Sequence, residues 1–277
     1  MTVFTPPALH GIIGYPLGHS LSPLLHNTAF RSLGLPGVYL PWLVEPGKLP
    51  AFMDALRLLD IRGCSITIPH KVDVLPLLDK MTEGVREMGA CNTIYRDNEN
   101  AVCGENTDVL GFMTPLRQQA LPPSTRVLLL GAGGVARAAV AGLRRFGLAN
   151  ITVANRNPAR AKALCDEFGL AAAPWEERGE VPAELVVNTT SLGMTGAQEH
   201  ETPYPAFRGK GVAYDLIYTP FHTRFLREAA AAGWNTLSGL DMFIAQGDAQ
   251  FHLWTGQHLP PQAAQAVTAA LYGKAAS

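Results

Sequence analysis

The stretch VLLLGAGGVARAAVAGL, residues 127 to 143, limits the possible folds of this chain more than any other. An apolar strand pattern ends at Leu130, a turn with three glycines follows, and an alanine-rich helical pattern begins at once. This is the G-x-G-x-x-A form of the dinucleotide-binding fingerprint, in which glycines let the backbone approach a pyrophosphate at a helix N-terminus. A glycine-rich tight turn that binds nothing is the alternative. The residues predicted to bind the cofactor here are Gly131, Ala132, Gly133, Gly134 and Val135.

The end of the next predicted strand indicates which dinucleotide binds. NAD sites commonly carry Asp or Glu about 20 residues after the glycine turn, where the carboxylate accepts hydrogen bonds from the ribose. Here the chain has Asn155, Arg156 and Asn157, with Arg160 one helical turn further on. A guanidinium pairs with a 2′-phosphate and no carboxylate repels it, so we predict NADP(H), bound in part by these four residues. The alternative is that Arg156 is an ordinary solvated arginine.

Short apolar strand patterns alternate with helical patterns along the chain, which predicts two α/β units. The predicted strands are residues 11–15, 38–44, 64–68 and 92–96 in the first series and 126–131, 151–155, 184–188 and 211–217 in the second. Residues 24–32 and 49–59 are predicted helices. The chain from Gly239 onward is also predicted to be helical, and its apolar residues Met242, Phe243, Phe251 and Trp254 are expected to pack on the first unit.

We therefore expect an α/β protein with a cleft between two domains. Residues 1–107 and 238–277 form a substrate domain with a mainly parallel sheet, and residues 108–237 form a Rossmann domain that binds NADP(H).

The overall charge and composition exclude several classes of protein. The net charge is −1 and no basic run is present, which argues against a nucleic-acid partner. No apolar run approaches the ~20 residues of a membrane span, and the N-terminus lacks the pattern of a signal peptide. Four cysteines without zinc spacing indicate buried thiols, so we expect a soluble cytoplasmic protein without a structural metal.

Several ordered segments closely resemble the shikimate dehydrogenase family, from Gly14 to Gln246. The segments are GYPLGHSLSPLLHN, ITIPHK, ACNTI, GENTDVLGF, GAGGVARA, NRN, NTTSLGM, DLIYTP and GLDMFIAQG. The resemblance implies reversible, NADPH-dependent reduction of 3-dehydroshikimate to shikimate in aromatic amino acid biosynthesis. A quinate/shikimate dehydrogenase that uses NAD and a non-catalytic dinucleotide-binding regulator are the alternatives. A monomer or a homodimer is expected.

The resemblance places Lys71 and Asp108 at the reacting centre as a pair. Lys71 is expected at the C-terminal end of a parallel strand, at the edge where open α/β sheets bind ligands, and Asp108 is expected to end another short strand. Oxidation of a secondary alcohol removes a proton from the hydroxyl as hydride leaves the carbon, so Lys71 is the candidate proton carrier. A neutral Lys71 that accepts the proton and a charged Lys71 that stabilises the alkoxide both remain open. Without the family pattern, a solvated lysine and a helix-capping aspartate would be ordinary alternatives.

The remaining site residues are implied by the same resemblance. Ser20 and Ser22 precede a helical pattern, where hydroxyls and helix N–H groups suit a carboxylate but also suit an ordinary helix cap. The family usually has Asn where Ser65 stands, so this chain departs from the family pattern at one position near the substrate. His19, His26 and His70 are expected to be structural or peripheral. The implied substrate contacts are Ser20, Ser22, Thr67, Asn92, Asp108, Tyr218 and Gln246, and the further cofactor contacts are Leu216 and Gly239.

Overall fold

The computed structural model describes residues 6–18 and 20–275, which fold into two compact units. Unit 1 contains residues up to 107 together with 246–270, and unit 2 contains 108–245 together with the end of the chain from 271. The first division falls after Thr107. The second falls at Gln246, inside helix α8 (Gly239–Thr255), where the sequence had suggested a boundary just before this helix.

Unit 1 is built on a six-stranded mixed sheet with the order β2-β1-β3-β5-β6-β4. β5 runs antiparallel to both neighbours and the other neighbouring pairs are parallel, so the expectation of a mainly parallel sheet is confirmed. The short strand β4 was not predicted, and β6 is the short strand that was expected to end at Asp108. The strands are β1 (Ala8–Gly14), β2 (Gly37–Leu43), β3 (Gly63–Ile66), β4 (Lys80–Met81), β5 (Thr93–Arg96) and β6 (Val102–Glu105).

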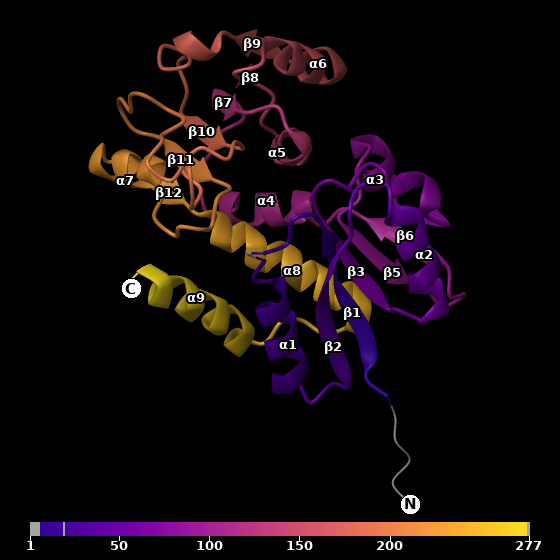
Figure 1. The fold of residues 1–277 in the computed structure, drawn as a ribbon. Coiled ribbons are helices and arrows are strands. Elements are labelled where there is room, and N and C mark those ends of the chain that lie inside the picture. The colour runs from indigo at the N-terminus through magenta and orange to yellow at the C-terminus, as the bar shows by residue number, and fades with distance from the viewer. Residues whose placement is uncertain (1–5, 19, 276–277) are drawn as a thin grey trace, which may run out of the picture. The chain divides into compact units, whose positions relative to one another are not determined.

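Helices cover both faces of this sheet, and Figure 1 shows α1 (Ser22–Ser32) and α2 (Leu49–Leu58) on opposite sides of it. Met53 and Leu56 of α2 pack in an aliphatic core with Ile94. The other face is aromatic, because the His26 ring of α1 stacks on Tyr39 and lies against Trp254 of α8. The smaller helical elements of this unit are η1 (Leu75–Leu77) and α3 (Glu83–Met88), and α9 (Pro261–Ala275) begins in it.

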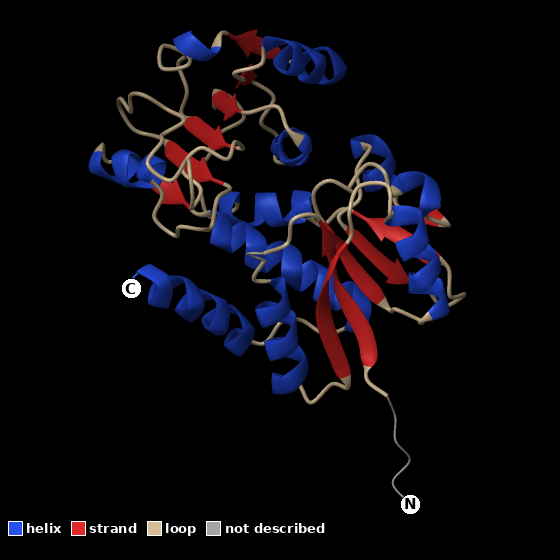
Figure 2. Cartoon of the chain, in the orientation of Figure 1, coloured by secondary structure: helices blue, strands red, loops and turns tan. Residues whose placement is uncertain are grey.

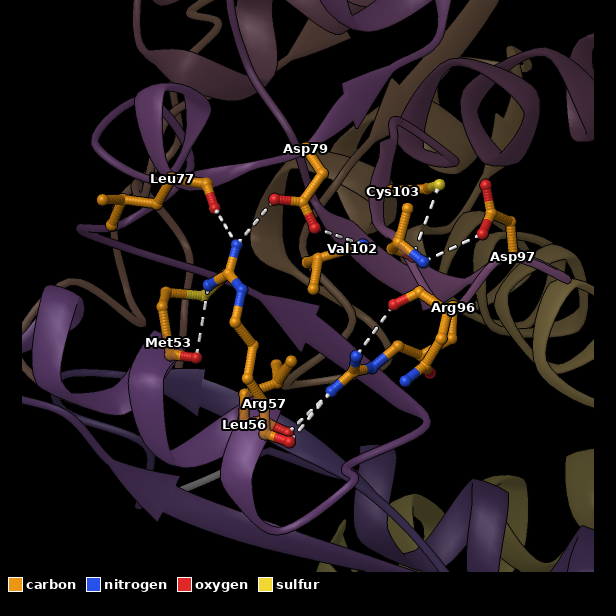
Figure 3. A network of polar contacts seen from close by, with 11 residues as sticks. Met53, Leu56, Arg57, Leu77, Asp79, Arg96, Asp97, Val102 and Cys103 are labelled. Atoms are coloured by element: carbon orange, nitrogen blue, oxygen red, sulfur yellow. Dashed lines mark hydrogen bonds and ion pairs between the residues drawn. The ribbon is translucent and has the colours of Figure 1, made fainter.

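A polar network holds the C-terminal end of α2 to the strands (Figure 3). The Arg57 guanidinium donates to the Leu77 carbonyl and to Asp79 Oδ1, each at 3.0 Å. Asp79 Oδ2 accepts from the Val102 N–H at 2.8 Å, and this bond, followed by Arg57, lowers the pKa of the carboxyl group. Arg96 donates to the Leu56 carbonyl at 3.0 Å. These bonds give partners to backbone carbonyls that the end of a helix leaves without any.

Unit 2 contains an all-parallel sheet with the order β12-β11-β10-β7-β8-β9. Counted within the unit, this is the order 3-2-1-4-5-6 that is typical of Rossmann domains, so the predicted fold class is confirmed. Ligands of such sheets bind beyond the carboxyl ends of the strands where the order reverses, which is here between β7 and β10. The strands are β7 (Val127–Leu130), β8 (Ile151–Ala154), β9 (Ala171–Ala173), β10 (Leu185–Asn188), β11 (Val212–Asp215) and β12 (Asn235–Leu237).

Alternation along these strands supplies a core on each face, because successive side chains point to opposite sides. Leu129 and Val187 belong to the core under α4, α5 and α6, whereas Leu128 and Val186 belong to the core under α7. Figure 2 shows the helices of the unit in blue and its strands in red. The helices are α4 (Asp108–Leu116), α5 (Gly134–Arg145), α6 (Pro158–Phe168) and α7 (Arg224–Ala231), with a short η2 (Trp175–Glu177).

Helix α8 begins in unit 2 and ends in unit 1, which corrects one expectation about its packing. Phe251 and Trp254 pack in unit 1, as predicted, but Met242 belongs to the core of unit 2.

All four cysteines are buried, as expected. Within residues 6–18 and 20–275, no helix is long and apolar enough to cross a membrane.

Candidate functional site

The glycine turn after β7 is shaped by a close approach to the loop after β10. Gly131 has a φ of +109°, and a Cβ at this position would lie 2.5 Å from Thr189 Oγ1. Thr189 is held there because both its N–H and its hydroxyl donate to the Leu130 carbonyl at 2.8 Å. Only glycine meets both conditions without strain. The predicted turn therefore lies at the switch point of the sheet.

The next two glycines leave open space beside the start of α5. No atom lies within 4 Å of a Cβ built on Gly133 or Gly134. Gly133 is the N-cap of α5 without a capping side chain, and the first turn of this helix contains no acidic residue. Helix N-termini bind anions through their free N–H groups and the helix dipole. The turn thus fits the pyrophosphate of a dinucleotide.

The predicted NADP-selective residues lie beyond the end of β8. Arg156 and Arg160 are exposed. The Asn157 side chain caps α6 by accepting from the N–H groups of Ala159 at 3.0 Å and Arg160 at 3.2 Å. Asn155 Nδ2 donates to the Asn157 carbonyl at 2.8 Å. The two asparagines therefore fix the loop that carries the arginines, a structural role that the sequence motif did not reveal.

A buried polar cluster at the ends of β10 and β11 was missed by sequence analysis. Asp215 accepts from Thr223 Oγ1 at 2.6 Å, Asn188 Nδ2 at 2.9 Å and the Ile217 N–H at 3.1 Å. Burial raises the pKa of Asp215 to about 7, and these donors oppose that effect. Asn188 and Asp215 are register partners on adjacent strands, which only the folded sheet reveals.

The other predicted cofactor contacts meet beside this cluster. A Cβ on Gly239 would lie 2.4 Å from the Leu216 carbonyl oxygen, so the start of α8 packs directly on the chain after β11. Tyr218, a predicted substrate contact, stacks on Phe243 of α8 with ring centroids 4.8 Å apart. Burial raises the pKa of Tyr218, which keeps the phenol neutral. Leu216, Tyr218 and Gly239 thus lie together in unit 2.

In unit 1, Lys71 lies in the turn that follows β3, rather than directly at the end of a strand as predicted. Three contacts fix this turn. The buried His70 ring contacts the Val44 carbonyl at 2.7 Å through Nε2, and the His70 N–H donates to the Thr67 carbonyl at 2.9 Å. The Lys71 carbonyl accepts from the Cys91 N–H at 2.8 Å. His70 is therefore structural, as expected, and it holds the neighbouring lysine.

Thr67, Ser20 and Ser22 all belong to unit 1, where local hydrogen bonds place them. The Thr67 N–H donates to the Ile13 carbonyl at 3.0 Å, which extends the pairing of β3 with β1. Ser22 is the first residue of α1 rather than a residue before the helix, and its N–H donates to Ser20 Oγ at 3.3 Å. His19 lies outside the described residues.

Asn92 is buried just before β5 and is tied to the chain before α4. Its Oδ1 accepts from the Thr107 N–H at 2.8 Å and from Thr93 Oγ1 at 2.7 Å, and its Nδ2 donates to Thr107 Oγ1 at 3.0 Å. Asp108, which follows directly, opens α4 and does not end a strand as predicted, because β6 ends at Glu105. Asp108 belongs to unit 2 and Lys71 to unit 1, so their pairing stays a prediction.

The Ser65 hydroxyl forms hydrogen bonds with two other buried side chains. It accepts from the Tyr39 hydroxyl at 2.7 Å and donates to Gln250 Oε1 at 2.8 Å. Gln250 lies one helical turn after Gln246 on α8, so these two side chains share a helix face. Sequence analysis missed Tyr39 and Gln250. Among the described residues, no cluster of His, Cys, Asp or Glu has the make-up of a metal site.

Comparison with known proteins matches three family descriptions along the chain. They are "Shikimate dehydrogenase substrate binding domain" at residues 12–94, "Shikimate / quinate 5-dehydrogenase" at 116–192 and "Shikimate 5'-dehydrogenase C-terminal domain" at 239–272. A curated relative from Pelobacter propionicus, named shikimate dehydrogenase (NADP(+)), is 58% identical over 98% of this chain and 99% of its own.

Two solved structures are similar over nearly the whole chain. Shikimate 5-dehydrogenase from Thermus thermophilus, in complex with NADP(H) and shikimate, is 40% identical with a TM-score of 0.86, covering 95% of this chain and 100% of its own. Quinate dehydrogenase from Corynebacterium glutamicum, in complex with NAD, is 29% identical with a TM-score of 0.88, covering 96% of this chain and 100% of its own.

Proposed function

The chain belongs to the shikimate dehydrogenase family, and from this we infer that it is an NADP-dependent shikimate dehydrogenase. The observation that carries this conclusion is the 58% identity to a shikimate dehydrogenase (NADP(+)) over nearly the full length of both chains. The enzyme is an oxidoreductase of the shikimate pathway. It interconverts 3-dehydroshikimate and shikimate, and the nicotinamide of bound NADP(H) supplies the hydride chemistry.

Lys71 is proposed to move the proton at the substrate hydroxyl oxygen, with Asp108 as its partner in orienting that hydroxyl. The anchored turn around His70 and Cys91 supports this role, since a group that acts in the transition state must be held in place beforehand. Neutral Lys71 would accept the proton, whereas charged Lys71 would stabilise the developing alkoxide.

The substrate and cofactor residues are proposed on the same basis. Ser20 and Ser22, at the start of α1, would hold the substrate carboxylate, and Thr67, Asn92, Tyr218 and Gln246 would bind the ring hydroxyls. The glycine turn and the start of α5 would hold the pyrophosphate, Arg156 and Arg160 the 2′-phosphate, and Leu216 and Gly239 the nicotinamide end.

Two further expectations remain proposals. Four buried free thiols suit the reducing cytoplasm that we propose as the location. A monomer or homodimer is proposed for the assembly.

The relative in complex with NAD keeps one alternative open, a quinate/shikimate dehydrogenase that uses NAD. The exposed Arg156 and the absence of an acidic residue in the first turn of α6 favour NADP.

Absorbance at the nicotinamide band tests the proposed function. Purified enzyme is mixed with NADP+ or NAD+ and with shikimate or quinate, in all four combinations. Fast reduction with shikimate and NADP+ is the expected result, with the other pairs slower. Equal or faster turnover of quinate with NAD+ would favour the alternative. Cofactor binding without turnover of any pair would mean that the fold serves a non-catalytic role.

A further inference from the structure

We propose that Gln250, acting with Ser65 and Tyr39, is a positioning residue that holds the Asn92 carboxamide in the single orientation in which it binds the substrate. The proposal rests on the proposed function, in which Asn92 contacts shikimate. It adds buried residues that would act on the substrate through Asn92. The relevant elements are β2, β3 and β5 of unit 1 and the part of α8 that packs on them (Figure 1).

The donor and the acceptor of each hydrogen bond in this series follow from one backbone group. The Thr107 N–H donates to Asn92 Oδ1 at 2.8 Å, and a backbone N–H is always a donor. The carboxamide oxygen of Asn92 must therefore face Thr107. Thr93 Oγ1 lies 2.7 Å from the same oxygen, so the Thr93 hydroxyl must also donate to it.

The same argument gives the donor and the acceptor of each further hydrogen bond in the series. Because the Thr93 proton is used on Asn92, its oxygen accepts from Gln250 Nε2, at 2.9 Å. The Gln250 amide then presents Oε1 to Ser65, whose hydroxyl donates to it at 2.8 Å. Ser65 in turn accepts from the Tyr39 hydroxyl at 2.7 Å. Each of these hydrogen bonds thus pairs a donor with an acceptor, and reversing one amide would place like groups together at two contacts.

Burial makes this order costly to break. Tyr39 is fully buried, Gln250 and Asn92 are 2% exposed and Ser65 is 5% exposed, so water has little access to replace a lost partner. Burial also raises the pKa of Tyr39 well above its ordinary value, which keeps its hydroxyl a donor. Among these hydrogen-bonded residues Gln250 alone lies on α8, and its bonds connect that helix to β3 and β5.

Gln250→Met is the first test, because methionine has a similar volume but cannot form the three hydrogen bonds of Gln250, which join it to Ser65, to Thr93 and to the Asn92 carbonyl. The KM for shikimate is expected to rise about 5- to 10-fold, the equivalent of one buried hydrogen bond, while the KM for NADP+ stays within about two-fold. The matched control is Trp254→Phe, which removes the bond from Nε1 to the Ile94 carbonyl one turn further along α8. This control is expected to lower the melting temperature and leave the KM for shikimate unchanged.

Gln250→Glu gives a readout that a merely structural residue would not produce. A protonated carboxyl group keeps the acceptor and one of the two donors of the amide, whereas the ionised group has no donor for Thr93. Burial raises the pKa of a glutamate above its ordinary value of about 4.3. The ratio of variant to parent KM for shikimate is therefore expected to fall toward one as the pH is lowered, and a ratio independent of pH would contradict the proposal.

Ser65→Ala tests whether Ser65 acts through Gln250. It also tests the proposal if the Gln250→Met variant does not fold. The KM for shikimate is expected to rise about 2- to 5-fold. The double variant Ser65→Ala/Gln250→Met should match Gln250→Met alone, because Ser65 acts only through Gln250. Additive effects, or an unchanged KM in folded variants of an enzyme that turns over shikimate, would overturn the positioning role. Absence of turnover in the parent enzyme would instead refute the proposed function.

Discussion

The backbone carbonyl of Lys71 accepts a hydrogen bond from the N–H of Cys91 at 2.8 Å, which ties the proposed proton carrier to the chain that leads into β5. Cys91 directly precedes Asn92, a proposed substrate contact. On the other side, the buried His70 ring is fixed on the Val44 carbonyl. The backbone that carries Lys71 and Asn92 is therefore set within unit 1 itself, before any ligand binds, which is the arrangement that positioned catalytic groups require.

Lys71→Met is expected to lower kcat by orders of magnitude with only a modest change in the KM for shikimate. The reason is that a proton carrier acts chiefly in the transition state, whereas a residue that binds only the ground state would change KM. Steady-state rates at the nicotinamide band measure both constants. Lys80→Met, which removes an exposed lysine of the same unit, is the control with an unchanged kcat. A Lys71→Met enzyme with near-normal kcat would exclude the assignment.

Arg156→Gln is expected to raise the KM for NADP+ about 10- to 100-fold, because one charge-assisted contact to the 2′-phosphate is lost. The KM for NAD+, which lacks this phosphate, should change little. Lys162→Gln is the matched control, since Lys162 is an exposed cation on α6 that pairs with Asp166. An equal rise in the KM for NADP+ and for NAD+ would show that Arg156 attracts both cofactors by its charge and does not recognise the 2′-phosphate.

The sequence predicted the fold where the pattern was local and strong. The glycine turn, the strands that flank it and the sheet class followed from periodicity and spacing. Asp108 was misplaced at the end of a strand because β6 is short, and a short apolar run does not define its own boundary. The bond between Ser65 and Gln250 joins residues 185 positions apart, and no local pattern could indicate it.

Two of the buried histidines, His10 and His26, should make the protein less stable in mild acid. Burial lowers the pKa of His10 to about 4 and that of His26 to about 3, from 6.5. Below pH 6.5 the unfolded chain takes up protons that the folded protein does not, so the free energy of unfolding falls with pH by up to about 1.4 kcal/mol per unit for each histidine. Above pH 6.5 these groups have no effect.

Urea unfolding at a series of pH values measures this slope. His26→Leu should make the slope shallower, and His200→Gln, at an exposed position, should leave it unchanged. A slope that His26→Leu leaves intact would show that other groups control the acid sensitivity.

Asp215 should act in the opposite direction. Its pKa is raised from 3.8 to about 7, so between these values the unfolded chain has lost the proton that the folded protein keeps. The free energy of unfolding therefore falls as the pH rises through this window, and is constant above it. Asp215→Asn keeps an acceptor for Asn188 and removes the buried charge, and is expected to stabilise the protein by up to about 2 kcal/mol at pH about 8.

Chemical denaturation of the Asp215→Asn variant at low and high pH checks this, with the exposed Asp166→Asn as the comparison. Lower stability of Asp215→Asn at high pH would mean that the bonds from Thr223 and Asn188 outweigh the cost of burying the charge.

The two ends of the glycine turn should respond differently to the same substitution. Gly133→Ala places a methyl group in open space at a φ of −91°, so stability should be retained, yet the KM for NADP+ should rise because this space is where the pyrophosphate is proposed to lie. Gly131→Ala combines a φ of +109° with a contact of 2.5 Å to Thr189 Oγ1, and should cost at least about 1 kcal/mol of stability. Thermal unfolding and steady-state kinetics on both variants separate the two effects. A Gly133→Ala enzyme with unchanged affinity for NADP+ would place the pyrophosphate elsewhere.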